Sequence, residues 1–203
     1  MKIYDISMMV EEDMPVYKNK KDKQPIINTT TNNDSTESKI SFGMHTGTHM
    51  DMPMHFVKNG KTIDTLNLNR VITTCKVLDF TYIKEAITSE DLKKKNLEEG
   101  DFLLFKTKNS YSKEFDFNFV YLSYDGAEFL KEMNINGVGI DSLGIERSQA
   151  NHPTHKILLE KEIIIIEGLR LKNIKEGIYK LIALPLKLKG VEASPIRAVL
   201  LKD

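Results

Sequence analysis

The chain has 203 residues, which is enough for one well-buried domain and more typical of one domain than of two. Hydrophobic residues make up 40% of the chain and charged residues 29%, as in ordinary soluble globular proteins. Lysine plus arginine equals aspartate plus glutamate at 29 each, so no basic excess favours a phosphate backbone. Nucleic acid is therefore not expected as a partner.

The first residues lack an apolar segment followed by a small-residue cleavage site. No stretch reaches the roughly 18 consecutive apolar residues that a membrane span requires. We therefore expect a cytoplasmic protein with no membrane partner. The single cysteine, Cys75, excludes an internal disulfide. It lies in the strand-like run 73–80, where we expect a buried, inert thiol.

The segment 17–41 is rich in lysine at first, then in threonine, asparagine and serine, and it has no apolar period. This composition predicts a solvated loop. The alternative is a mobile flap or an oligomer contact, because functional loops often lie beside a site that a rigid scaffold supports.

Most strand-like runs lie in the second half of the chain, and several are nearly continuous in apolar residues: 102–105, 163–166 and 179–184. Such runs suit strands that are covered on both faces. Helices are predicted between them, over 90–99 after Ser89 and before Gly100, over 125–133 after Ser123, and over 154–161 after Pro153. With no internal repeat and no dividing linker, the chain predicts a single mixed α/β domain built on a β-sheet.

The most informative stretch is residues 45–55, which reads His-Thr-Gly-Thr-His-Met-Asp-Met-Pro-Met-His and holds three of the five histidines. A helix turns each residue by about 100°, which would point Asp51 and His55 away from His45 and His49. An extended chain points all four of these odd-numbered residues to one side. Imidazole and carboxylate together are ligands that suit zinc, manganese or iron. The segment therefore predicts most of a metal site.

A straight strand would hold His45 and His49 about 13 Å apart, too far to share one ion. The chain must therefore bend between them, and Gly47 permits such a bend. Asp51 could then coordinate one ion directly or bridge two ions. The alternative is that these are surface histidines on a loop.

Two remote residues are the best further candidates for ligands. His155 lies in the predicted helix after Pro153, and Glu167 follows four consecutive isoleucines. A carboxylate at the end of such an apolar strand needs a partner or a cation. The alternative for Glu167 is an ion pair with Arg170 or a lysine. For His152, beside the proline, we expect a capping or packing role.

The pattern of residues 45–55 resembles the signature of the cyclase-type metal-dependent hydrolases, which include bacterial kynurenine formamidases and isatin hydrolases. The resemblance extends over nearly the whole chain. Its other matching segments are 5–7, 13–17, 139–141, 155–159, 165–169, 184–186 and 194–198.

The resemblance implies a swivelling β/β/α-type fold and a homo-oligomer, a dimer or a tetramer. It implies that His45, His49 and Asp51 hold one divalent ion. Asp51, His155 and Glu167 would hold a second. The expected cofactor is two Zn²⁺ per chain, with Mn²⁺ as the alternative metal. His55 would act as the proton shuttle.

One departure concerns the substrate. Kynurenine formamidases resemble one another in a tryptophan after the N-terminal Pro-Val, whereas this chain has Tyr17 there and no tryptophan at all. We expect Tyr17 to contact the substrate and the surface that recognises an aryl group to differ.

The predicted reaction is hydrolysis of an amide-type C–N bond by metal-activated water, with His55 as the proton shuttle. The expected small-molecule substrate is an aryl formamide such as N-formylkynurenine, or a small cyclic amide. A lactone hydrolase or a dehydratase-like enzyme could use the same site. A non-catalytic metal-binding regulatory or storage module is the alternative from another class, and it predicts ligands without a proton shuttle.

Overall fold

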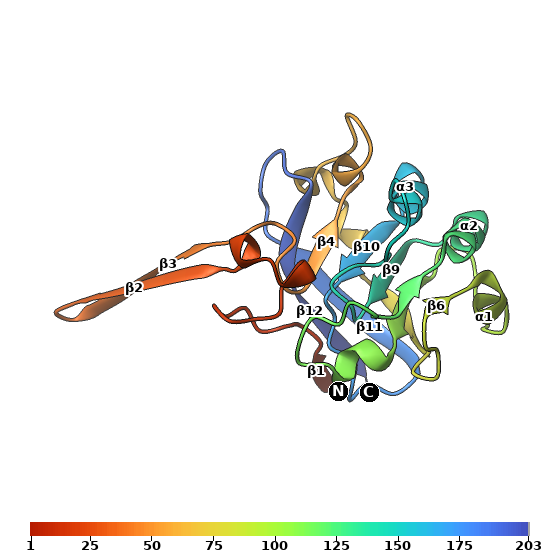
Figure 1. Cartoon of the computed structure of the whole chain (residues 1–203), viewed down its shortest axis with the longest axis horizontal. Helices are drawn as coiled ribbons and strands as arrows, with labels where there is room; N and C mark the ends of the chain where they lie inside the picture. Colours follow the sequence, from red (N-terminus) through yellow and green to blue (C-terminus); the bar gives the residue numbers. More distant parts are fainter. Residues whose placement is uncertain (203) are drawn as a thin grey trace.

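The computed structural model describes residues 1–202, and at its centre a mixed β-sheet of eight strands closes on itself (Figure 1). The strand order is β1-β12-β11-β5-β7-β9-β10-β4, and β4 also pairs with β12. The strands of this sheet are β1 Lys2–Asp5, β4 His49–Asp51, β5 Ile72–Asp79, β7 Phe102–Lys106, β9 Gly137–Ile140, β10 Ile164–Glu167, β11 Gly177–Pro185 and β12 Ala193–Lys202. The predicted α/β class with a mixed sheet is confirmed.

Residues of the barrel strands alternate between two hydrophobic layers. In β10, Ile164 and Ile166 pack in a hydrophobic cluster with residues from strands on the opposite side of the barrel. These two side chains therefore lie in the interior of the barrel. Ile165 belongs to a second cluster with helix residues such as Leu158, which places it on the outer face. All residues of β7 and β10 are therefore buried on both faces, as their continuous apolar runs predicted.

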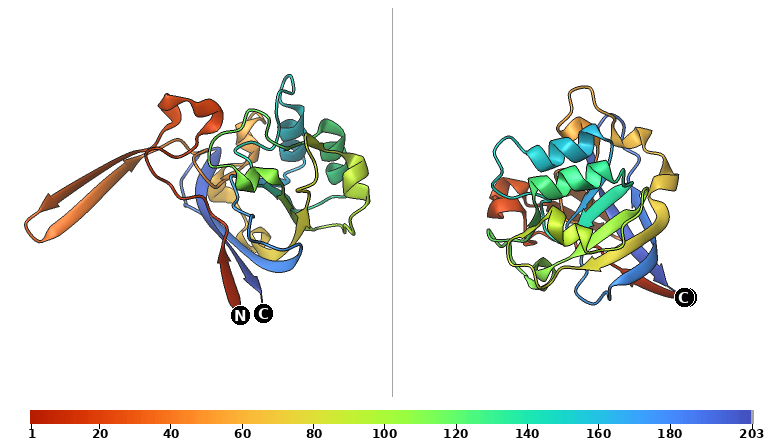
Figure 2. Two further views of the ribbon diagram at one scale, coloured as in Figure 1. Left: turned by 60° about the horizontal axis from the view of Figure 1, so that its bottom comes forward. Right: turned by 90° about the vertical axis from the view of Figure 1, so that its right-hand side faces the viewer.

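The corresponding prediction for β11 is wrong. Its residues alternate between buried and more exposed, as in Tyr179 at 4% and Ile178 at 61% exposure. Only the inward face of this strand is covered, since the three helices gather over the other side of the barrel (Figure 2). Cys75, on the neighbouring β5, is buried as predicted.

The helices are α1 Ser89–Lys93, α2 Tyr124–Glu132 and α3 Pro153–Glu160. The second and third agree closely with the predicted ranges, and Ser123 caps α2 by accepting a hydrogen bond from the Gly126 N–H. The helix predicted over 90–99 is wrong beyond Lys93. Lys76 donates to the Asn96 carbonyl and Lys95 pairs with Glu176, and these contacts hold the following residues against the sheet. Within residues 1–202, no helix is long and apolar enough to cross a membrane.

The solvated loop predicted over 17–41 is largely exposed as expected, but the prediction that it lacks secondary structure is wrong. Two 3-10 turns, Tyr17–Asn19 and Lys21–Lys23, lead into a hairpin of β2 (Ile26–Asn32) and β3 (Ser35–Ser41). The hairpin projects from the body of the molecule as a long arm (Figures 1 and 2). Its threonine-rich strands favour β structure. Their apolar period is missing because nearly every hairpin residue is exposed.

The bend predicted before His49 is present. Gly47 has a φ of 62°, in the left-handed region that glycine tolerates. Gly168 follows β10, has a φ of 72° and packs directly against Gly47. A Cβ at Gly168 would overlap the carbonyl group of Gly47. Thr48 ties the two turns together, because its hydroxyl donates to the Gly168 carbonyl at 2.6 Å. The remaining short elements are β6 Ala86–Ile87, β8 Tyr121–Leu122 and the 3-10 turns Pro53–His55, Ile63–Thr65, Leu68–Arg70 and Lys108–Tyr111.

The contact between the two glycine turns predicts a measurable cost for Gly168→Ala. We expect the free energy of unfolding to fall by about 2 to 4 kcal/mol, since a left-handed alanine is strained and its methyl group displaces Gly47. Chemical denaturation measures this loss. Gly190→Ala is the matched control, because Gly190 has a φ of 75° but no atom near its missing Cβ. Equal losses in both variants would contradict a role for the Gly47 contact.

Candidate metal centre and active site

The centre of the site is a cross-strand pair. His49 of β4 lies directly opposite Glu167 of β10, and Asp51 lies opposite Ile165. Because Ile165 packs in the layer beneath the helices, His49, Asp51 and Glu167 lie on this same outer face of the barrel. The His49 Nε2 is 3.3 Å from a Glu167 oxygen and 3.5 Å from an Asp51 oxygen. All three side chains are almost completely buried.

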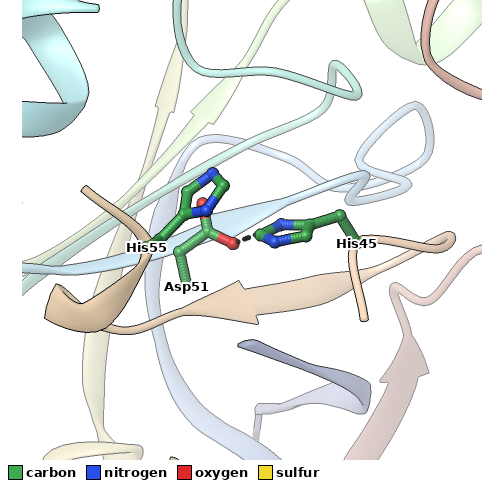
Figure 3. A group of neighbouring side chains, drawn as sticks. All are labelled: His45, Asp51 and His55. Atoms are coloured by element: carbon green, nitrogen blue, oxygen red, sulfur yellow. Dashed lines mark ion pairs between the residues drawn. The ribbon is translucent and has the colours of Figure 1, made fainter. Parts of the chain in front are cut away.

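Two histidines reach Asp51 from the flanking turns. The bend at Gly47 returns His45 toward β4, so that its Nδ1 lies 3.0 Å from Asp51 Oδ1 (Figure 3). His55 ends the 3-10 turn that follows β4, and its ring centroid is 4.2 Å from that of His45. One ligand atom from each of His45, Asp51 and His55 lies within 4.8 Å of the others.

The third contribution comes from helix α3. His155 Nε2 is 3.2 Å from Glu167 Oε1 and 3.8 Å from Asp51 Oδ2. Glu167 pairs with these histidines and accepts a hydrogen bond from the Ile145 N–H, and among residues 1–202 it has no ion pair with Arg170 or a lysine. The structure thus brings together the six residues that the sequence singled out: His45, His49, Asp51, His55, His155 and Glu167.

Unsatisfied polar atoms test whether these residues fit a cation. The His49 Nδ1 donates to the Gly47 carbonyl at 2.9 Å, which leaves Nε2 facing two carboxylates. Among residues 1–202, neither this Nε2 nor either Asp51 oxygen has a hydrogen-bond partner, although all are buried. A buried carboxylate without such partners is costly unless a cation compensates it. The donor set of imidazoles and carboxylates therefore fits a divalent metal.

The pKa values of the histidines reflect the negative charge of the buried carboxylates. Burial alone would lower the pKa of His49, but its contacts with Glu167 and Asp51 raise that pKa to about 9. Burial likewise opposes protonation of His155, yet Glu146, Glu167 and Asp51 raise its pKa to about 10. Burial dominates at His55 and lowers its pKa to about 4. At neutral pH, His49 and His155 therefore both carry a proton, and their positive charges lie next to the buried carboxylates.

Glu146 is a component of the site that sequence analysis missed. It is 4% exposed, its Oε1 lies 3.3 Å from His155 Nδ1, and its Oε2 accepts a hydrogen bond from the His155 N–H. His152 stands at the N-cap position of α3, but its side chain contacts Glu146 Oε1 at 2.5 Å and does not cap the helix. Glu146 is a single acidic residue in a polar loop, and no sequence pattern relates it to the helix that follows. The contact could therefore not be predicted from the sequence.

A pocket of about 200 Å³ opens above these residues. His45, His55, His155 and Glu167 form part of its lining. Tyr17, Phe56 and Leu143 supply its apolar wall, and Lys23 is also part of the lining. Tyr17 packs edge-on against Phe115 at a centroid distance of 5.3 Å. The predicted substrate-contacting residue therefore lies in the pocket that part of the histidine and carboxylate cluster lines. No sequence pattern indicated Phe56.

Comparison with known proteins shows the family to which this chain belongs. Residues 4–147 match the model of the Cyclase family, described as "Putative cyclase". Cyclase-like protein 3 of Oryza sativa subsp. japonica is 33% identical over 217 residues, which cover 99% of this chain and 80% of that protein. Kynurenine formamidase of Salinibacter ruber is 31% identical over 208 residues, which cover 98% of this chain and 97% of that protein.

Solved structures share the fold. A "predicted metal-dependent hydrolase" from Bacillus stearothermophilus aligns with a TM-score of 0.92 at 50% identity, covering 98% of this chain and 97% of that one. Isatin hydrolase A from Labrenzia aggregata aligns with a TM-score of 0.85 at 23% identity, covering 98% and 93%, and supports the fold alone. This chain belongs to the Cyclase family, and the family resemblance and fold predicted from the sequence are confirmed.

The contact between Glu146 and His155 predicts an effect on metal affinity. We expect Glu146→Gln to weaken binding of Zn²⁺ or Mn²⁺ by about 10- to 100-fold, because a carboxylate on the far nitrogen orients a ligating imidazole and raises its basicity. Competition with a chromophoric chelator measures this affinity. Glu160→Gln, at the exposed end of the same helix, is the control. Wild-type affinity in Glu146→Gln would contradict the expected support of His155.

Proposed function

We propose that this protein is a metal-dependent hydrolase that cleaves an amide-type C–N bond in a small molecule. The observation that carries the proposal is a cluster of four histidines and two carboxylates at a pocket, in a member of the Cyclase family. His49, Asp51, His155 and Glu167 of this cluster are buried, and His45 and His55 are half-buried. The similarity to a kynurenine formamidase over nearly the full length of both proteins supports amide chemistry. A panel of aryl formamides and small cyclic amides, assayed with metal-loaded protein, tests it.

The proposed ligands are His45, His49 and Asp51 for one ion, and Asp51, His155 and Glu167 for a second. We propose zinc, with manganese as the alternative. A bound divalent cation supplies Lewis acidity toward the carbonyl oxygen and lowers the pKa of water. The chain itself orients the ligands: the Gly47 carbonyl fixes the His49 ring, and the Ile145 N–H fixes Glu167.

His55 is the proposed acid–base group. It lies beside the cluster at a centroid distance of 5.8 Å from His155, and it faces the pocket. Burial lowers its pKa, so the imidazole is neutral at pH 7. A neutral imidazole has one nitrogen that can accept a proton and one that can donate a proton. We assign to it the transfer of a proton from the attacking water to the leaving nitrogen. A storage or regulatory module would have no use for this residue.

The pocket favours a small substrate. Its volume of about 200 Å³ lies below the 300 to 1,000 Å³ usual for sites of drug-sized ligands. Tyr17 and Phe56 can flank one aromatic ring, since aromatic faces pack well on one another. We therefore favour a single-ring formamide or cyclic amide over N-formylkynurenine, whose amino acid side chain extends well beyond its ring.

A homo-oligomer, either a dimer or a tetramer, is also proposed, in the cytoplasm. The β2–β3 arm supports it, because the outer edges of both strands pair with no other strand within residues 1–202. A two-stranded hairpin is only marginally stable by itself in water, and open strand edges bind other chains readily.

A first test concerns metal content. Purified protein reconstituted with zinc or manganese is expected to hold about two ions per chain by elemental analysis. Asp51→Ala should lose most of this metal, since one carboxylate contacts both halves of the cluster. Full stoichiometric metal in Asp51→Ala, or none in the wild type, would contradict the proposed centre.

A second test separates His55 from the ligands. His55→Ala is expected to keep its metal content near that of the wild type while kcat falls by about 100- to 10,000-fold, the range for a positioned acid–base group. Elemental analysis and steady-state kinetics on the same preparation measure both quantities. Loss of metal equal to that of His49→Ala would instead make His55 a ligand.

A further inference from the structure

The lysine-rich run before the hairpin is not explained by the chemistry proposed above. Residues 18–23 contain four lysines and one aspartate in a chain whose formal net charge is zero. Lys18, Lys20, Lys21 and Lys23 are exposed, and none lies within 4.0 Å of a carboxylate among residues 1–202. Lysines elsewhere do find such partners, as Lys106 does with Asp79. The positive charge of this run is therefore available to a ligand.

Two of these lysines lie beside Tyr17, and one of the two lines the active-site pocket. The Nζ atoms of Lys18 and Lys23 each lie 5.3 Å from the centroid of the Tyr17 ring. Lys23 also belongs to the pocket lining together with Tyr17. Cation–π contacts at this distance hold the two ammonium groups near the ring. The segment is fixed to the body, because the Gln24 side-chain amide donates to the Met14 carbonyl at 3.1 Å and Met14 is buried.

The carboxylates in the same pocket do not neutralise Lys23. Glu146 is engaged by His152 and His155, and Glu167 by His49 and His155. Both acids belong to the base of the pocket, whereas Lys23 is an exposed residue. A ligand in the pocket thus meets the metal-binding cluster at one end and an uncompensated ammonium group at the other.

The geometry points to an anion subsite at the pocket mouth, formed by Lys23 with support from Lys18, that binds a carboxylate carried by the substrate. This inference rests on the proposed function and narrows its substrate class to single-ring amides that bear a carboxylate, such as formylated aminobenzoates. The ring lies between Tyr17 and Phe56, its amide faces the histidine cluster, and its carboxylate faces Lys23.

Exposed ion pairs are weak, so the expected effect is moderate. The experiment compares 4-formamidobenzoate, whose carboxylate lies across the ring from its amide, with formanilide, which has the same amide and ring but no carboxylate. Since the carboxylate also changes intrinsic reactivity, the readout is the ratio of kcat/KM for the two substrates. In Lys23→Gln this ratio is expected to fall by about 3- to 10-fold, mainly through a higher KM for 4-formamidobenzoate. Lys23→Glu should lower it further.

Ionic strength and position supply the controls. The effect of Lys23→Gln should shrink as salt rises from 0.05 to 0.5 M, because exposed charges are screened. Lys84→Gln changes an exposed lysine outside both the pocket lining and the β2–β3 arm, and it should leave the ratio as in the wild type. A ratio in Lys23→Gln equal to that of the wild type would overturn the anion subsite while leaving the amidase proposal intact.

A binding experiment separates failure of the anion subsite from failure of the proposed function. If neither amide is hydrolysed by metal-loaded protein, the subsite is tested by titration calorimetry with the same two amides as ligands. Weaker binding of 4-formamidobenzoate by Lys23→Gln than by the wild type, without the same change for formanilide, would support the subsite. Equal binding of 4-formamidobenzoate by both proteins would overturn it.

Discussion

Strand β4 is only three residues long, yet both of its edges are paired, and the rest of the site depends on that double pairing. One edge bonds to β10 and the other to the start of β12, which closes the barrel. The same register sets His49 opposite Glu167 and turns Met50 into the barrel interior. A slip of one residue would bury Met50 among the acids and send His49 into the apolar core. Closure of the barrel and assembly of the acid–histidine cluster are therefore one structural event.

The cluster does not stabilise the fold by itself. Buried carboxylates lose their hydration, and Asp51 recovers no hydrogen bond from residues 1–202 for either oxygen. Contacts with histidines compensate this only when the imidazoles are protonated, which is why the pKa values of His49 and His155 rise. The barrel around them supplies the missing stability through two large apolar layers. Functional sites commonly contain buried groups that destabilise the fold locally, and packing elsewhere in the protein offsets this loss of free energy.

The histidine segment could be interpreted from sequence because its constraints are local. The bend at Gly47 and the alternation of His49 and Asp51 depend only on the backbone of residues 45–55, and the structure has both. The predicted period of two is wrong beyond β4, because His45 precedes the bend and His55 ends a 3-10 turn. Glu167 could be found because an acid after four isoleucines is anomalous. Glu146 could not, since its partners are set by how α3 packs. The hairpin was missed because strand prediction relies on a buried face, which this arm does not have.

The two ends of the pocket rest on different kinds of structure. His49, Asp51 and Glu167 belong to paired strands of the barrel, where a displacement of one strand disturbs its neighbours. Tyr17 and Lys23 belong to short turns that contact the body through few side chains. Sequence changes in the turns can therefore alter which molecule enters without altering the chemistry at the base. Tyr17, expected from the sequence in place of the tryptophan of kynurenine formamidases, and the run of lysines after it both lie in these turns. In this chain, similarity to a relative informs the reaction more strongly than it informs the substrate.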